Sequence, residues 1–137
     1  MATVDLTAHT FEQTITDNEI VLVDWWAEWC GPCKAFAPVF HGASERNADI
    51  VFGKIDTEAE QHLAGSAGIR SIPTLMVFRE GVLVFSQPGA LPGHVLDDLI
   101  AQVRELDMEA VHADVAAQRG TSTDHGDDQA VDGSTDD

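Results

Sequence analysis

Residues 1–106 alternate between short apolar runs and segments with helical periodicity. Residues 20–26 form a nearly continuous apolar run with several β-branched side chains, which is typical of a strand buried on both faces of a parallel sheet. Residues 50–56 form a second run of this kind. Helical patterns lie before and after the first run, and they predict helices over residues 8–17 and 31–47.

The rest of this region predicts a short helix, a hairpin and a last helix. Residues 57–60 (Thr-Glu-Ala-Glu) have the spacing of a capping box and predict a helix start. Residues 74–79 and 82–87, joined by Glu80-Gly81, predict an antiparallel hairpin. An apolar stripe at helical spacing predicts the last helix and consists of Val95, Leu96, Leu99, Ile100, Val103 and Leu106. A β–α–β unit followed by a ββα unit predicts an α/β fold with a mixed sheet.

Charge and composition divide the chain near residue 106. Residues 1–106 hold fifteen acidic and six basic residues, whereas residues 107–137 hold nine acidic residues and one basic residue. Residues 107–119 carry apolar side chains at helical spacing, while residues 120–137 are mainly Gly, Ser, Thr, Asp and His without periodicity. We therefore expect one domain over residues 1–106, a short helix over 107–119 and an acidic disordered tail over 120–137.

The net charge of −17 excludes some classes of partner. Nucleic-acid binding depends on Lys and Arg at the phosphates, and this chain has only seven basic residues against 24 acidic ones. No apolar run approaches the length of a membrane span, and the first residues have no cationic and apolar leader pattern. We expect a cytoplasmic protein without nucleic-acid or membrane partners, whose acidity reflects either a salt-rich cytoplasm or a solvated, self-repelling tail.

The two cysteines, Cys30 and Cys33, directly follow the first buried strand and open the next helix. A thiol at a helix N-terminus faces unpaired N–H groups and the positive end of the helix dipole, and both favour the reactive thiolate. Two intervening residues allow the second thiol to reach the first. Cys33 can therefore resolve a mixed disulfide formed by Cys30, which gives a reversible dithiol–disulfide couple.

Two structural interpretations of the cysteine pair are weaker. A zinc site needs two further ligands, and the six histidines are scattered with none at ligand spacing, so no metal is expected. A purely structural disulfide that closes so short a loop contributes little stability and does not persist in a reducing cytosol.

Several segments together resemble one family. They are residues 21–34 (VLVDWWAEWCGPCK), Pro38, residues 69–74 (IRSIPT), Gly81 and residues 88–90 (PGA). This set resembles the thioredoxin family over about residues 4–106. The resemblance implies the thioredoxin fold, with a mixed central β-sheet and helices on both faces. Ser71 and Pro88 depart from the common family pattern, which puts substrate preference in doubt rather than redox competence.

The resemblance also implies roles for individual residues. Cys30 would be the exposed nucleophile, Cys33 the buried resolving thiol, and Pro73 a cis proline facing both. The rim that docks the substrate chain would consist of Trp29, Gly31, Pro32, Ile72, Pro73, Gly89 and Ala90.

Asp24 and Lys54 are the polar residues of the two buried strands that we connect with catalysis. A carboxylate in an apolar strand has its pKa raised by desolvation, and a place near Cys33 suits Asp24 to accept that thiol's proton. The alternative is a carboxylate that caps a neighbour at the end of the strand. Lys54 is similar to the family lysine that tempers this carboxylate, or it extends its amino group to water.

The function that the resemblance implies is that of a cytoplasmic protein-disulfide reductase. It would hold no bound cofactor, act as a monomer on protein disulfides, and receive electrons from NADPH through a flavin-dependent thioredoxin reductase. A thiol oxidase or isomerase is disfavoured by the Gly-Pro pair between the cysteines, where oxidising relatives usually have His. A non-catalytic binding module is disfavoured because such modules often lose one cysteine, whereas this chain keeps both.

Deletion of residues 120–137 is expected to leave folding intact, because a segment that buries little apolar surface adds little stability. Thermal unfolding of the full and truncated chains should give closely similar melting temperatures. A large loss of melting temperature after truncation would show that the tail packs.

Overall fold

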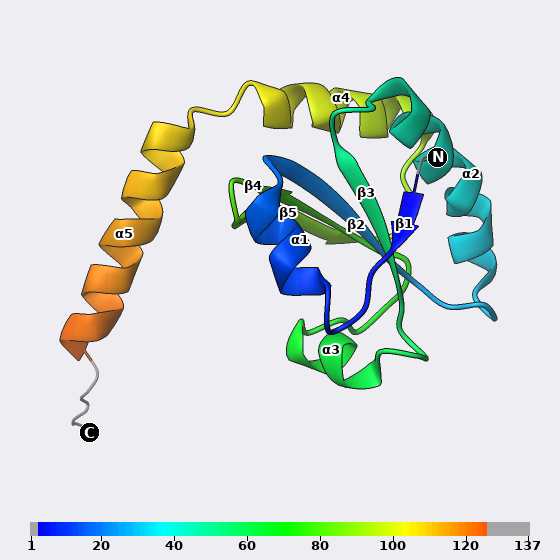
Figure 1. The fold of residues 1–137 in the computed structure, drawn as a ribbon, viewed down its shortest axis with the longest axis horizontal. Helices are drawn as coiled ribbons and strands as arrows, with labels where there is room; N and C mark the ends of the chain where they lie inside the picture. The colour runs from blue at the N-terminus through cyan, green and yellow to red at the C-terminus, as the bar shows by residue number, and fades with distance from the viewer. Residues whose placement is uncertain (1–2, 126–137) are drawn as a thin grey trace. The chain divides into compact units, whose positions relative to one another are not determined.

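The computed structural model describes residues 3–125, which form five strands and five helices (Figure 1). In chain order these are β1 (Thr3–Asp5), α1 (Phe11–Asp17), β2 (Ile20–Trp26), α2 (Gly31–Arg46), β3 (Val51–Asp56), α3 (Gln61–Ser66), β4 (Thr74–Arg79), β5 (Val82–Pro88), α4 (Gly93–Arg104) and α5 (Met108–His125). The chain divides into two compact units between residues 104 and 105. The first unit holds β1 to α4, and the second holds α5. None of the helices within residues 3–125 has the length and hydropathy of a membrane span.

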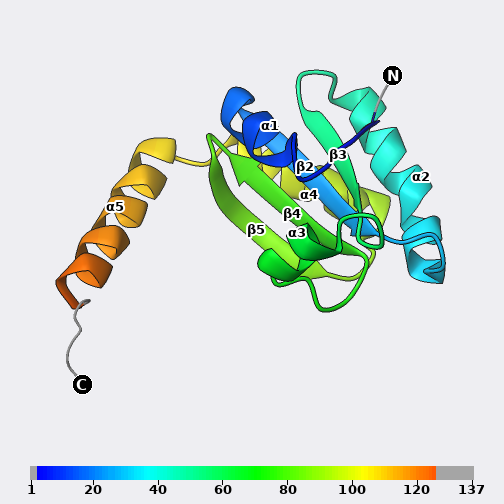
Figure 2. The ribbon, with the colours of Figure 1, turned by 60° about the horizontal axis from the view of Figure 1, so that its bottom comes forward.

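The first unit is built on one mixed sheet with the strand order β1-β3-β2-β4-β5. Strands β1, β2 and β3 are parallel, while β4 is antiparallel to both β2 and β5. Helices α1 and α3 lie on one face of the sheet, and α2 and α4 lie on the other (Figures 1 and 2). The predicted α/β fold with helices on both faces is confirmed.

The strand register decides which side chains lie beneath α2. Phe52 of β3 contacts Phe40 of α2, with ring centroids 5.2 Å apart. Lys54 lies two residues further along β3 and therefore shares this face, and its register partner on β2 is Asp24. The next residue, Trp25, points to the opposite face and contacts α1. Asp24 and Lys54 thus lie on the sheet face that α2 covers.

Two elements differ from the predicted pattern. The three-residue strand β1 has no counterpart in the prediction. The predicted capping box does not begin a helix, because the Asp56 carboxylate accepts the N–H groups of Glu58 and Ala59 at 2.9 and 3.3 Å. The Thr57 hydroxyl instead donates to the carbonyl of Trp26 at 3.0 Å. Residues 57–60 therefore form a turn that ties the end of β3 to the end of β2, and α3 begins after it.

The helix of the second unit is longer than predicted. We expected a short helix over residues 107–119 and disorder from residue 120, but α5 runs from Met108 to His125. Extending an existing helix costs much less than starting one, so six residues of the predicted tail continue the helix. Residues 126–137 of the predicted tail lie outside the described part of the chain.

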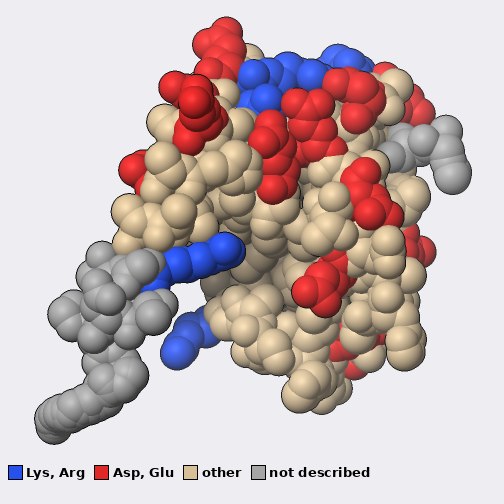
Figure 3. Space-filling model, turned by 60° about the vertical axis from the view of Figure 1, so that its left-hand side comes forward, with Lys and Arg blue, Asp and Glu red and all other residues tan. Residues whose placement is uncertain are grey.

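Acidic side chains are spread over much of the face drawn in Figure 3 rather than gathered in one patch. Four basic side chains of the first unit form ion pairs with acidic side chains. They are Lys34 with Glu28 at 3.8 Å, Arg46 with Asp97 at 2.8 Å, Arg79 with Glu19 at 3.2 Å, and Arg104 with Asp49 at 2.8 Å. Exposed pairs contribute about 0.2–1 kcal/mol each, and three of the four are of this kind, whereas the Arg79 side chain is only 11% exposed. Most of the stability of this unit therefore comes from its buried core.

Gly53 gives a test of how tightly the sheet is packed. It lies in β3 between β1 and β2, and a Cβ added there would collide with the side chain of Leu6, which is itself buried in the core. We expect Gly53→Ala to lower the free energy of unfolding by about 1–3 kcal/mol. Thermal unfolding should then show a melting temperature lower by several degrees.

Gly65→Ala is the matched control. Gly65 lies in α3, and a Cβ there meets no atom within 4 Å. The same substitution should raise stability slightly at this position, since Ala is favoured over Gly inside a helix by about 0.5–1 kcal/mol. Equal melting temperatures for the two variants would contradict the packing argument.

Candidate active site

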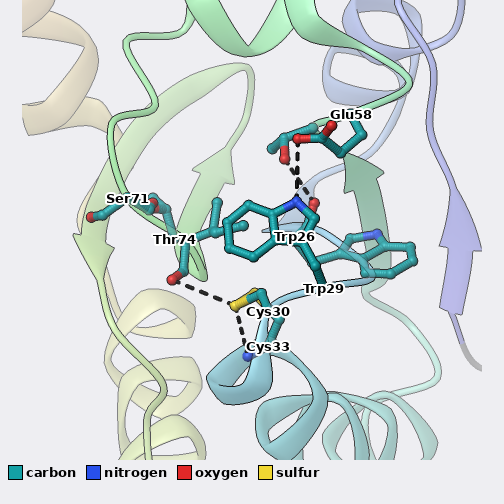
Figure 4. Close-up of a disulfide and its surroundings, with 9 residues drawn as sticks. Trp26, Trp29, Cys30, Cys33, Glu58, Ser71 and Thr74 are labelled. Atoms are coloured by element: carbon teal, nitrogen blue, oxygen red, sulfur yellow. Dashed lines mark hydrogen bonds between the residues drawn. A yellow bond between two sulfur atoms is a disulfide. The ribbon is translucent and has the colours of Figure 1, made fainter.

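The two cysteines form a disulfide at the first turn of α2 (Figure 4). The short loop that follows β2 delivers Cys30 to the N-cap position of α2, where its backbone is extended and Pro32 occupies the first turn. The N–H of Cys33 donates to the Cys30 sulfur at 3.2 Å. The sulfur thus takes the place that a Ser, Thr or Asp oxygen takes in an ordinary N-cap.

Both sulfurs are shielded from solvent. Cys30 is 3% exposed and Cys33 2% exposed, and they form a small apolar cluster with Ala27 against which Trp26 and Ile72 pack. The expectation of an exposed Cys30 is therefore wrong for this oxidised state. Trp26 and Ala27, which are close in sequence, pack around it, and so does Ile72 from 42 residues away, whose carbonyl lies against the Cys30 sulfur.

A loop from the distant part of the chain lies directly against the disulfide. The peptide bond between Ile72 and Pro73 is cis, and the carbonyl oxygen of Ile72 is 3.7 Å from the Cys30 sulfur. The carbonyl of Pro73 accepts the N–H of Gly89 at 2.7 Å. The hydroxyl of Thr74 donates to the carbonyl of Ser71 at 2.6 Å. These contacts fix the loop between the start of α2 and the end of β5.

The expected rim residues come from segments that surround the disulfide. Gly31 and Pro32 separate the two cysteines, Ile72 and Pro73 belong to the loop against Cys30, and Gly89 is bound to that loop, with Ala90 next to it. Gly31, Pro32, Gly89 and Ala90 are exposed, Ile72 is half-buried and Pro73 is buried. Trp29 is a large apolar side chain of this rim and is 69% exposed.

Sequence reasoning missed Glu58. Its carboxylate accepts the indole N–H of Trp29 at 3.3 Å (Figure 4). Glu58 follows β3 in the same way that Trp29 follows β2, and the two strands are parallel neighbours. The sequence could have indicated this contact, because the carboxyl ends of neighbouring parallel strands meet at one edge of the sheet.

Asp24 is fully buried on the sheet face that α2 covers. Neither of its carboxylate oxygens has a hydrogen-bond partner within residues 3–125. Burial raises the pKa of Asp24 from 3.8 to about 7, and the positive charge of Lys54 offsets part of that rise. The Lys54 amino group lies 4.7 Å from the centre of the Trp26 ring. In the part of the chain described, this carboxylate does not cap a neighbour; it is an unpaired acid that can hold or release a proton near neutral pH.

Among residues 3–125, no group of three His, Cys, Asp or Glu side chains is placed to hold a metal ion. The redox-active group that the site does hold is the pair of sulfurs. A disulfide that is bonded through its first sulfur to a helix N-terminus, with an unpaired acid under the same helix, can cycle between the dithiol and disulfide forms.

Comparisons with known proteins agree with this geometry. The family model described as Thioredoxin matches residues 2–104. A Streptomyces coelicolor protein provisionally named thioredoxin 2 is 60% identical over 118 residues, which cover 86% of this chain and 88% of that protein. The thioredoxin of Bacillus subtilis is 40% identical over 101 residues, which cover 73% of this chain and 96% of that one.

Solved structures give the same result. A mutant thioredoxin from Halobacterium salinarum aligns with a TM-score of 0.70 at 35% identity, covering 76% of this chain and 91% of that one. Plasmodium falciparum thioredoxin aligns with a TM-score of 0.67 at 34% identity, covering 73% and 97%. The chain therefore belongs to the thioredoxin family of disulfide oxidoreductases, and Cys30 and Cys33 are its dithiol–disulfide pair.

Proposed function

We propose that this protein is a cytoplasmic thioredoxin that acts as a monomer and reduces disulfides in other proteins. A flavin-dependent thioredoxin reductase regenerates it with electrons from NADPH. The observation that carries this proposal is the placement of the Cys30 sulfur. It accepts the N–H of Cys33 at the N-cap of α2, beside the carbonyl of Ile72.

In the first step the reduced Cys30, as a thiolate, attacks one sulfur of the substrate disulfide. A bond forms between Cys30 and that sulfur, the substrate S–S bond breaks, and the other substrate sulfur leaves as a thiolate that takes up a proton. The Cys33 N–H and the start of the helix stabilise the negative charge on Cys30 before the attack. The intermediate is a mixed disulfide.

In the second step Cys33 loses its proton and attacks the Cys30 sulfur. The bond between Cys30 and the substrate breaks, and the substrate's second sulfur leaves as a thiolate that is then protonated. The Cα atoms of the two cysteines are 5.2 Å apart in the disulfide, which is within the ordinary range for such a bond. Over both steps the substrate gains two electrons and two protons, and the protein is left oxidised.

We assign Asp24 as the group that accepts the Cys33 proton. It lies under α2, its oxygens are unpaired, and its pKa of about 7 is close to the pH at which a general base is most effective. Lys54 favours the charged form of Asp24 from the neighbouring strand. Both side chains act on the proton and not on the substrate.

The substrate chain docks on the rim formed by Trp29, Gly31, Pro32, Ile72, Pro73, Gly89 and Ala90. The exposed face of Trp29 offers apolar area, and the small residues of the rim let a substrate backbone approach closely. Because the Pro73 carbonyl is already bonded to Gly89, the backbone of Ile72 remains for pairing with the substrate beside Cys30.

Reduction of insulin disulfides, coupled to NADPH consumption by a thioredoxin reductase, tests the proposed function. The unmodified protein should sustain turnover, and Cys30→Ser should abolish it because the attacking sulfur is gone. Cys33→Ser, the same change at the second sulfur, should instead accumulate a mixed disulfide with the substrate. Turnover that is absent in the unmodified protein or unchanged in Cys30→Ser would refute the proposal.

Asp24→Asn tests the proton acceptor. Only the ionised carboxylate can accept a proton, so release of substrate from the mixed disulfide should accelerate as pH rises through about 7. The variant should lack this step in the pH profile and release substrate about 10²-fold more slowly at pH 8. Rapid-mixing measurements of the second step give both quantities. Glu12→Gln, which removes an exposed charge on α1, should leave the profile unchanged.

Stability provides an independent control on the pKa of Asp24. Because this pKa is raised from 3.8 to about 7 in the folded protein, the folded state binds more protons than the unfolded state between those values. The contribution of Asp24 to the free energy of unfolding is therefore fully present below about pH 4. It is lost as pH rises through 7, and the free energy of unfolding falls by up to about 4 kcal/mol. Denaturation of Asp24→Asn should lack this loss. An equal pH dependence in both proteins would contradict the raised pKa.

A further inference from the structure

A groove of about 320 Å³ lies between β5 and α4, outside the site described above. Four apolar side chains line it, namely Phe85, Leu91, Val95 and Leu99, together with the polar side chains of Gln87, Asp98 and Gln102. Val95 is 37% exposed, although it lies on the helix stripe that the sequence pattern assigns to the core. The groove therefore presents apolar surface that the first unit does not cover itself.

The groove begins beside the disulfide site. The last residue of β5, Pro88, pairs in register with Thr74, which directly follows Pro73. The next residue, Gly89, is bonded to the Pro73 carbonyl, and Leu91 of the groove follows only two residues later. From this end the groove follows α4 for about two turns, or about 10 Å, which is enough for about three residues of extended chain.

Charge selects the kind of chain that can bind there. Strand β5 contains no charged residue, in a protein whose net charge is −17. The groove itself carries one carboxylate, Asp98, which is exposed and has no ion-pair partner in the described part of the chain. Its neighbour Asp97, by contrast, is paired with Arg46 at 2.8 Å. A cation beside an apolar side chain would match these features, whereas an acidic segment would be repelled.

We propose that this groove binds a segment of the protein substrate in which a bulky apolar side chain stands next to a Lys or Arg. The inference rests on the proposed function, because the same substrate places its disulfide at Cys30. The apolar side chain covers Val95 and Leu99, and the cation pairs with Asp98. Binding in the groove raises the local concentration of the substrate disulfide at the rim and so sets a preference among substrates.

A second hollow shows why the groove at α4 is the better candidate. It has a volume of about 450 Å³ and is lined by Val4, Glu45 and Ile50 among others. These residues belong to the edge strand β1, to the end of α2 and to the position just before β3. That is the opposite edge of the sheet and the opposite end of α2 from Cys30. The residues that line this second hollow do not extend to the disulfide, so a chain bound there would not be led to Cys30.

Single-turnover reduction of synthetic peptides by the pre-reduced full-length protein tests the proposal without involving a reductase. Each peptide carries one intramolecular disulfide, joined through a flexible Gly/Ser linker on either side to Leu-Lys-Leu, to Leu-Glu-Leu or to Ser-Ser-Ser. At subsaturating concentration the Leu-Lys-Leu peptide should react about tenfold faster than the Ser-Ser-Ser peptide. The Leu-Glu-Leu peptide should gain much less.

Variants of exposed residues assign this preference to the groove. Val95→Glu should remove the tenfold advantage, and Asp98→Lys should transfer the preference from the Leu-Lys-Leu to the Leu-Glu-Leu peptide. Glu12→Lys makes the same change of charge on α1, on the other face of the sheet, and should preserve the preference. All variants should reduce the Ser-Ser-Ser peptide within about twofold of the unmodified protein, because none alters the disulfide site.

Equal rates for the three peptides, or an advantage that survives both groove variants, would overturn this inference alone. Concentration-dependent dimerisation that Val95→Glu abolishes would also overturn it, by making a second copy of the chain the occupant. Failure to reduce any of the peptides would overturn the proposed function and this inference together.

Discussion

The site depends on one interaction, the hydrogen bond from the Cys33 N–H to the Cys30 sulfur at the first turn of α2. A helix start leaves backbone donors that need an acceptor, and here the acceptor is the reactive atom itself. The group that caps the helix in the oxidised state would cap it better as a thiolate, because a charged acceptor makes a stronger bond. This geometry is held by strand β2, which is buried up to Trp25, on one side and by the core side chains of α2 on the other.

The fold was predictable where local pattern and tertiary burial agree. Strand β2 is apolar on both faces because helices cover both faces, so its composition alone indicates its place in the sheet. The hairpin turn was predictable from Gly81, because glycine is suited to the positive φ that the turn requires. Glu80 and Gly81 both adopt positive φ in the structure. Strand β1 was not predictable, since Thr3–Asp5 becomes a strand only by pairing with residues 52–54 of β3. The start of α3 moved for a related reason, because Thr57 bonds to β2 instead of capping a helix.

The site was predictable in its chemistry and less so in its geometry. The types and spacing of Cys30 and Cys33 indicate which atoms exchange electrons, and the place of Asp24 in an apolar strand supports the proton acceptor that we propose. The surroundings of those atoms depend in part on contacts between residues 29 and 42 positions apart in the chain, namely Glu58 with Trp29 and the Ile72 carbonyl with the Cys30 sulfur. Contacts at that separation leave no periodic signal in the sequence, so the burial of Cys30 could not be read from it, and Glu58 could be placed near Trp29 only through the parallel pairing of β2 and β3.

Asp24 is a residue whose cost to the stability of the fold can be weighed against its proposed function. Among residues 3–119, every other acidic side chain is exposed or half-buried, yet this one is fully buried and has no hydrogen-bond partner in the described part of the chain. An unpaired acid in a core destabilises the fold, and an apolar side chain of similar size would remove that penalty. Lys54 lowers the penalty only in part, since the pKa of Asp24 stays near 7. Packing alone thus supplies no reason for a carboxylate at this position. The proposed transfer of the Cys33 proton does, because it would require a base that is shielded from water and half-protonated near neutral pH.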